Sequence, residues 1–241
     1  MKEAAKNLLY RGYGRTTGRL RKFILRTALK REGGEFYSKT ARRILKDYHK
    51  VEIGMYTHGG CFAPGNFSPH TRIGRYCSIA RDALGFNRDH PVDFKSTHGF
   101  FFNSELDFCD EDKIEYTPLS VGHDVWIGSG AKILASVSEI GTGAVIGTQA
   151  VVTRDVPPYA VMMGYPARIV RYRFSKDIIE ALLESRWWEQ ELNDLKQHMD
   201  EFSRPYEKYY RTQHSDNSRE PQVESAVKET DQVRRGLKDA G

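Results

Sequence analysis

Two stretches of the chain, "VGHDVWIGSGAKILASVS" (residues 121–138) and "IGTGAVIGTQAVVTRDVP" (residues 140–157), each divide into three groups of six residues. The first place of every six holds a branched aliphatic residue: Val121, Ile127, Ile133, Ile140, Ile146 and Val152. The fifth place is always Val or Ala, and glycine fills the second place in four of the six groups. An α-helix repeats near 3.6 residues and a strand every two, so neither explains a period of six.

Hexads of this kind predict a parallel β-helix, in which each six forms one short flat side and a corner. Three sixes then close one turn of about 18 residues, and the aliphatic residues point inward and stack between turns. We expect the glycines at corners where the backbone takes an unusual conformation. Residues 73–84 keep the same pattern, and Ile53-Gly54 begins a weaker instance. Glu139 is one residue too many, which predicts a small bulge at a corner.

The six-residue repeat stops near Gly85 and resumes near Leu119, so residues 85–118 form a loop outside the repeat. A loop of this length in a compact domain is usually functional. It contains the segment "FNRDHPVDFKSTHGFFFN" (residues 86–103), with His90 and His98. Imidazole titrates near neutral pH, so either histidine is a candidate acid or base.

Residues 1–50 carry fifteen Lys and Arg against four Asp and Glu, whereas the whole chain has a net charge of only +5. They predict a basic helical lead-in, in which Leu20, Phe23, Ile24 and Ala28 fall at helical spacing. Two interpretations stay open. The helix is either an amphipathic surface that touches anionic lipid or a lipid-linked substrate, or it packs on the main domain with a solvated basic face.

The C-terminal part divides in two. Residues 175–203 carry a broad apolar stripe and predict an α-helix that follows the domain 51–174. Residues 212–241 are polar and predict a disordered tail.

The three cysteines match no zinc spacing and favour free thiols in a reducing cytoplasm.

The hexads, the histidine-proline loop and three further motifs are similar to those of a known family. The motifs are "DVWIG" (124–128), "VVTRDVPPYAVMMGYPAR" (151–168) and "RYRF" (171–174). Over about residues 40–200 the chain resembles the hexapeptide-repeat acetyltransferases, in the xenobiotic and polysaccharide O-acetyltransferase branch that includes the type B chloramphenicol acetyltransferases. The resemblance implies an all-β core, a left-handed parallel β-helix with a looped-out active-site segment, and a homotrimer. It also implies acetyl transfer from acetyl-CoA to a hydroxyl in a cleft between subunits.

By this resemblance His90 is the general base, and Asp93 or a backbone carbonyl holds its second ring nitrogen. His98 either lines the acceptor pocket, with Asp93, or simply packs, because Gly99 replaces a proline of the family pattern. Trp126 matches a tryptophan near the reactive end of the coenzyme. Further coenzyme contacts are expected at Ser129, Gly147 and Thr148 for the pantetheine arm and at Thr153, Arg154, Arg168 and Arg171 for the phosphates. No metal is expected, because the thioester is already activated.

The leading hypothesis is an acetyl-CoA-dependent O-acetyltransferase acting on a sugar of a surface polysaccharide or its precursor. It is expected in the cytoplasm, with peripheral membrane contact through the basic N-terminus and no nucleic-acid partner. An O-acetyltransferase of chloramphenicol or a streptogramin is the alternative in the same class. A non-catalytic β-helix scaffold remains a third hypothesis. A β-helical carbonic anhydrase would need His90, His98 and His123 to converge on zinc.

Overall fold

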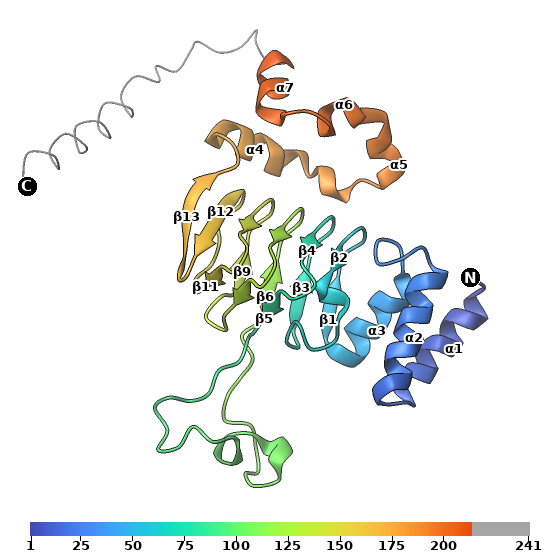
Figure 1. The fold of residues 1–241 in the computed structure, drawn as a ribbon, viewed down its shortest axis with the longest axis vertical. Coiled ribbons are helices and arrows are strands. Elements are labelled where there is room, and N and C mark those ends of the chain that lie inside the picture. Colours follow the sequence, from blue (N-terminus) through green and yellow to red (C-terminus); the bar gives the residue numbers. More distant parts are fainter. Residues whose placement is uncertain (214–241) are drawn as a thin grey trace, which may run out of the picture. The chain divides into compact units, whose positions relative to one another are not determined.

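The computed structural model describes residues 1–213, and residues 51–172 form a parallel β-helix with three sheets (Figure 1). The first sheet contains β1 (Val51–Ile53), β3 (Thr71–Ile73), β6 (Leu119–Val121) and β9 (Glu139–Ile140). The second contains β2 (His58–Gly59), β4 (Ser78–Ile79), β7 (Trp126–Ile127), β10 (Val145–Ile146), β12 (Ala160–Gly164) and β13 (Ala167–Tyr172). The third contains β5 (Leu84–Gly85), β8 (Lys132–Ile133) and β11 (Val151–Val152). All pairs are parallel except the final hairpin of β12 and β13.

The predicted hexads are confirmed as the core of this β-helix. The middle coils give one strand to each sheet, and the first coil meets the third sheet through a single bridge between Phe67 and Gly85. The first-place residues of successive coils pair directly, as Ile127 does with Ile79 and Ile146. Ile127, Ile133 and Ile146 are fully buried. The repeat extends upstream to β1, where Ile53 pairs with Ile73.

The second-place glycines form a column at one corner: Gly54, Gly74, Gly122 and Gly141. We expected an unusual backbone conformation there, and this reason is wrong, because none of the four has a positive φ. The close approach of successive coils explains them instead. A Cβ on Gly54 would lie 2.6 Å from the carbonyl carbon of Gly74, and a Cβ on Gly122 would lie 2.5 Å from the Thr142 nitrogen.

The left-handed backbone lies two residues further along the same corner. Tyr56, Tyr76, Asp124 and Tyr159 have φ between 54° and 65°. Their backbone N–H groups connect neighbouring elements, as in the 2.9 Å bond from Asp124 to the carbonyl of Arg75. The corner therefore has two requirements at two positions. The first position needs a residue without a side chain, and the second needs a backbone with positive φ.

The inward direction of Ile140 is kept, as predicted, but Glu139 itself is not at the corner: it is the first residue of β9 and pairs with Ser120, so the extra residue is taken up just before the strand, at Ser138. The backbone N–H groups of Ser138 and Glu139 donate to Oδ1 of Asp155 at 2.7 and 2.9 Å, and the Ser138 hydroxyl donates to Oδ2 at 2.9 Å. Burial opposes ionisation, but these donors hold the pKa of Asp155 below its usual value. One carboxylate of the next coil thus closes the wider corner.

Three helices precede the β-helix: α1 (Glu3–Gly14), α2 (Gly18–Arg31) and α3 (Lys39–His49). Tyr13, Ile24 and Ile44 of these helices share one buried core with Val51 and Phe62 of the first coil. The basic lead-in is therefore a small helical unit that covers the first coil, with α3 against β1 (Figure 1).

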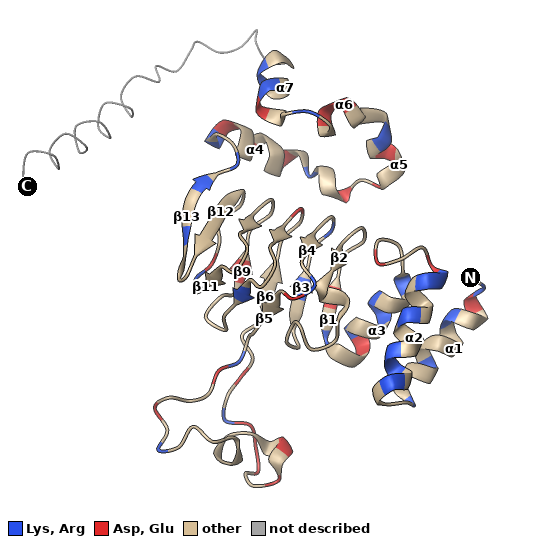
Figure 2. Cartoon of the chain, viewed as in Figure 1, with Lys and Arg blue, Asp and Glu red and all other residues tan. Residues whose placement is uncertain are grey.

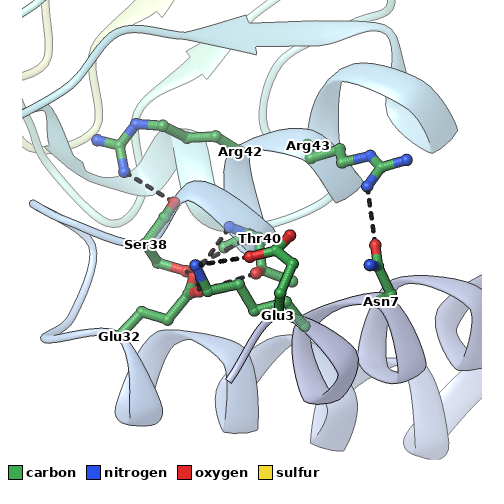
Figure 3. A network of polar contacts seen from close by, with 9 residues as sticks. Glu3, Asn7, Glu32, Ser38, Thr40, Arg42 and Arg43 are labelled. Atoms are coloured by element: carbon green, nitrogen blue, oxygen red, sulfur yellow. Dashed lines mark hydrogen bonds and ion pairs between the residues drawn. The ribbon is translucent and has the colours of Figure 1, made fainter. Parts of the chain in front are cut away.

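Arg42 of α3 closes this end of the β-helix. Backbone N–H groups of each coil donate to carbonyls of the next, as Gly54 does to Ile73. No coil precedes the first one, so its carbonyls need hydrogen-bond donors from elsewhere. The guanidinium of Arg42, only 8% exposed, donates to the carbonyl of Gly54 through Nε at 3.0 Å and Nη2 at 2.8 Å, and to that of Thr57 at 3.1 Å. It also donates to the carbonyl of Ser38 at 3.1 Å (Figure 3). Burial lowers the pKa of Arg42 to about 10, so it stays charged at neutral pH.

The predicted helix 175–203 is interrupted. α4 (Lys176–Ser185) ends at Arg186, which has φ 44°, and short helices follow: α5 (Leu192–Leu195), α6 (Met199–Phe202) and α7 (Tyr206–Gln213). The break lets Trp188 stack on the ring of His123 at 5.3 Å. Residues 1–192 form one compact unit, and a second begins at Asn193. The predicted tail 212–241 lies outside the described residues, apart from its first two.

We predict that Arg42→Gln lowers the free energy of unfolding by about 3 kcal/mol, because buried carbonyls lose a charged donor. Urea or thermal unfolding followed by circular dichroism measures this. The neighbouring Arg43 is a matched control, because it is exposed and its contacts are with surface groups: Asp47, the ring of Tyr10, and Asn7 (Figure 3). Arg43→Gln should cost about 0.5 kcal/mol or less. Equal losses in the two variants would contradict the end-closing role of Arg42.

Candidate active site

The excursion predicted between Gly85 and Leu119 leaves the coil after β5 and returns at β6 (Figure 1). The buried residue Asn87 connects the two ends of this loop by hydrogen bonds. The Asn87 side-chain amide donates to the carbonyl of Pro69, and the backbone carbonyl of Asn87 accepts the N–H of Thr117 at 2.8 Å. Both ends of the loop are therefore fixed to the β-helix at one corner, between the third and first sheets.

The loop also has an interior of its own. Arg88 lies 3.4 Å from Asp112 and covers the ring of Tyr116 at 5.2 Å. Asp112 accepts the N–H of Ser104 at 2.9 Å and its hydroxyl at 3.1 Å. These donors, the backbone N–H first, and Arg88 lower the pKa of Asp112. Phe102 is buried as well. These contacts connect residues from the two halves of the loop.

His90 is exposed, and two contacts orient its ring. Nδ1 lies 2.6 Å from the carbonyl oxygen of Thr97. A carbonyl only accepts, so Nδ1 carries the proton and Nε2 keeps a free lone pair. The ring meets Phe102 edge-on at 5.1 Å. Of the two groups that the sequence left open for this nitrogen, the structure gives the contact to a backbone carbonyl rather than to Asp93.

His90 opens onto a pocket of about 470 Å³. Asp93 and Lys113 of the loop contribute to its lining, as do Ala135 and Ser136 of the following coil. His98 does not line it. Nδ1 of His98 accepts the N–H of Phe100 at 3.3 Å, so within one chain this side chain packs against its own loop.

The residues expected to hold the coenzyme are spread over three places. Trp126, 56% exposed, lies on the outer face of the second sheet, in one row with Arg171 through the pairing of β7, β10, β12 and β13. Arg168 lies on the same final hairpin, opposite Met163. Within residues 1–213, the bonds found for these two arginines are with backbone carbonyls, at 2.9 Å for Arg168 and 3.1 Å for Arg171. Their charges are thus available to an anion.

The second place is the corner between the second and third sheets, which holds Ser129, Gly147 and Thr148. The Ser129 hydroxyl donates to Asp82 at 2.8 Å. The third place follows β11 and holds Thr153 and Arg154, at the same corner as the base of the loop. Within one chain, the structure does not bring His90 and Trp126 to a common site, because they lie at a corner and on a separate sheet.

Sequence reasoning allowed a backbone carbonyl beside His90 but did not identify which residue provides it, and it missed the contacts inside the loop. Thr97 acts through its backbone carbonyl, which has no signature in a sequence. Arg88 and Asp112 are 24 positions apart, and nothing local connects them. In the aromatic run "GFFF" (99–102), Phe102 is buried in the loop, whereas Phe100 and Phe101 are exposed.

The three histidines that a zinc site would need have different surroundings in this chain. Nδ1 of His123 accepts the N–H of Arg75 at 3.0 Å, and its ring stacks on Trp188. Among residues 1–213, no three His, Cys, Asp or Glu side chains are grouped as metal ligands would be.

Comparison with known proteins gives the family. No protein-family model matches the chain. It is 40% identical over 146 residues to a chloramphenicol acetyltransferase of Agrobacterium fabrum, covering 55% of this chain and 69% of that protein. It is 34% identical over 126 residues to a probable macrolide acetyltransferase of Lysinibacillus sphaericus, covering 48% and 67%. A galactoside O-acetyltransferase of Escherichia coli is 44% identical over 54 residues, covering 22% and 26%. The chain therefore belongs to the hexapeptide-repeat acetyltransferases, in the branch that contains the chloramphenicol acetyltransferases, and is an acetyltransferase.

Proposed function

We propose that this acetyltransferase transfers the acetyl group of acetyl-CoA directly to a hydroxyl, with His90 as the general base. The observation that carries the proposal is the contact between Nδ1 of His90 and the carbonyl of Thr97, which leaves Nε2 free to accept a proton. As the hydroxyl oxygen attacks the thioester carbonyl, Nε2 takes its proton. The C–O bond forms, the C–S bond breaks, and the imidazolium returns the proton to the departing thiolate. No covalent enzyme intermediate is needed.

The proposed site is shared between subunits of a homotrimer of left-handed β-helices. Two features support this. Trp126 lies on the second sheet and does not line the pocket at His90. The second sheet also ends in exposed apolar side chains that a partner could cover: Met163, Tyr165, Ile169 and Val170. The loop of one subunit would then meet the second sheet of its neighbour.

Acetyl-CoA would lie along this shared surface without a metal. Trp126 would contact its reactive end, and the small residues Ser129, Gly147 and Thr148 would allow backbone contacts with the pantetheine arm. The phosphates would bind cations and a hydroxyl near the remaining corner and hairpin: Thr153, Arg154, Arg168 and Arg171. Arginine suits this role because its planar fork matches phosphate oxygens.

For the acceptor we propose a sugar hydroxyl of a surface polysaccharide or its precursor. The lining of the His90 pocket supports it, because Asp89, Asp93, Lys113 and Glu115 offer hydrogen bonds to a hydroxyl-rich molecule. An antibiotic is the second candidate. The longer matches, to proteins named chloramphenicol and macrolide acetyltransferases, favour it.

Free coenzyme A release, with mass spectrometry of the acceptor, separates the two candidates. Acetyl-CoA is offered with mono- and oligosaccharides in one series and with chloramphenicol and a macrolide in the other. We expect acetylated sugar products. Release with an antibiotic alone would replace the first candidate by the second, and the absence of any acetylated product in both series would contradict O-acetyl transfer to either class.

Changing His90 to Ala should lower kcat by about a hundredfold or more, because a positioned base typically contributes about 10²–10⁴-fold. Steady-state kinetics measures this, and coenzyme binding and the unfolding temperature should be unchanged. His198→Ala, at an exposed position outside the β-helix, is the control. Turnover near that of the unmodified protein in the His90 variant would remove this residue from its role.

The double change Arg168→Ala and Arg171→Ala should raise KM for acetyl-CoA about tenfold, because hydrogen bonds between charged groups are lost. S-acetylpantetheine, which has no adenosine phosphates, serves as the matched donor. Its KM should be the same in the variant and the unmodified protein. An unchanged KM for acetyl-CoA, or an equal rise for both donors, would contradict a phosphate-binding role.

A further inference from the structure

The outward side of α2 combines cations with an exposed aromatic residue. Arg19, Phe23, Arg26 and Lys30 follow one another at helical spacing and are all exposed. Phe23 is 64% exposed. The opposite side of the helix is the one that enters the core, through Ile24, Leu25 and Ala28. The apolar residues of α2 therefore divide between two faces, and packing on the domain explains only one of them.

The neighbouring helix repeats this arrangement. Leu8 of α1 is 73% exposed, and Arg11 follows it on the same side at a spacing of three. Leu20, at the start of α2, is 50% exposed. Large apolar side chains are thus placed in solvent among cations on both helices.

The cations of this face have no acidic partner in the part of the chain that the structure describes. Among residues 1–213, the ion pairs do not include Arg11, Arg19, Arg26 or Lys30. The nearby acid Glu32 is occupied, since it accepts hydrogen bonds from Ser38 and Thr40 and lies 3.9 Å from Lys6. Figure 2 shows the resulting concentration of positive charge on α2.

We propose that this surface, the α1–α2 face, binds an anionic lipid bilayer. It consists of Leu8, Arg11, Arg19, Phe23, Arg26 and Lys30. Cations attract acidic headgroups, and Leu8 and Phe23 insert at the boundary of the acyl chains, as in helices that lie in the membrane interface. A soluble polyanion would be attracted by the cations but would give no reason for the exposed Leu8 and Phe23. The contact is peripheral, since no helix within residues 1–213 is long and apolar enough to cross a membrane.

Sedimentation of the full chain with lipid vesicles tests this. Vesicles contain phosphatidylglycerol and phosphatidylcholine in equal parts, or phosphatidylcholine alone. The protein should sediment with the anionic vesicles only, and high salt should release it. Arg19→Gln with Arg26→Gln and Lys30→Gln should lower the partition coefficient about a hundredfold. Phe23→Ser should lower it about tenfold and keep the salt dependence.

A control variant makes the same change in net charge elsewhere. Lys176→Gln, Arg204→Gln and Lys208→Gln lie outside the helical unit and should partition like the unmodified protein. Circular dichroism checks that each variant is folded. Failure to sediment, equal sedimentation with neutral vesicles, or an equal loss in the control variant would overturn the proposal. Unchanged binding of Phe23→Ser together with competition by duplex DNA would also overturn it, in favour of a general polyanion surface.

Discussion

Successive coils of this β-helix approach one another so closely at one corner that no side chain fits between them. Glycine occupies this position in four successive coils, as Gly54, Gly74, Gly122 and Gly141. Strands that pair in parallel lie about 4.8 Å apart, and the corner must keep the same spacing for the aliphatic residues to stack. The ordered pairing of the first and second sheets, on either side of this corner, therefore depends on four positions that carry no Cβ.

The rigid pairing of the β-helix explains how a loop outside the repeat can hold the candidate catalytic residue His90 in a fixed position. The loop 85–118 replaces one corner, and both its ends are fixed by a repeat that continues without interruption on either side. Its own ion pair, Arg88 with Asp112, and the buried Phe102 then hold His90 against the carbonyl of Thr97. The position of the imidazole is set by the loop interior, and the β-helix sets the position of the loop.

The sequence predicted the parts of the molecule that repeat. The stacked residues from Ile53 to Val152 and the limits of the loop follow from a period of six, as does the inward direction of Ile140 after the extra residue. It did not predict features that arise from contacts distant in sequence or from the backbone alone. The stacking of Trp188 on His123 coincides with a helix break that the apolar stripe of residues 175–203 could not reveal. The glycine column was predicted for the wrong reason, because a sequence shows the absence of a side chain but not the atom that excludes it.

The closure of the first coil has a consequence for how copies of the chain associate. An open coil offers a row of unpaired carbonyls, which is a template for another strand and hence for growth into a fibre. Arg42 occupies such acceptors from within the chain, and α3 covers the apolar interior behind them. At the other end, the antiparallel hairpin of β12 and β13 interrupts the parallel order of the second sheet. Stacking end to end is thereby blocked, and the sides of the coil are left as the surfaces through which a finite assembly can form.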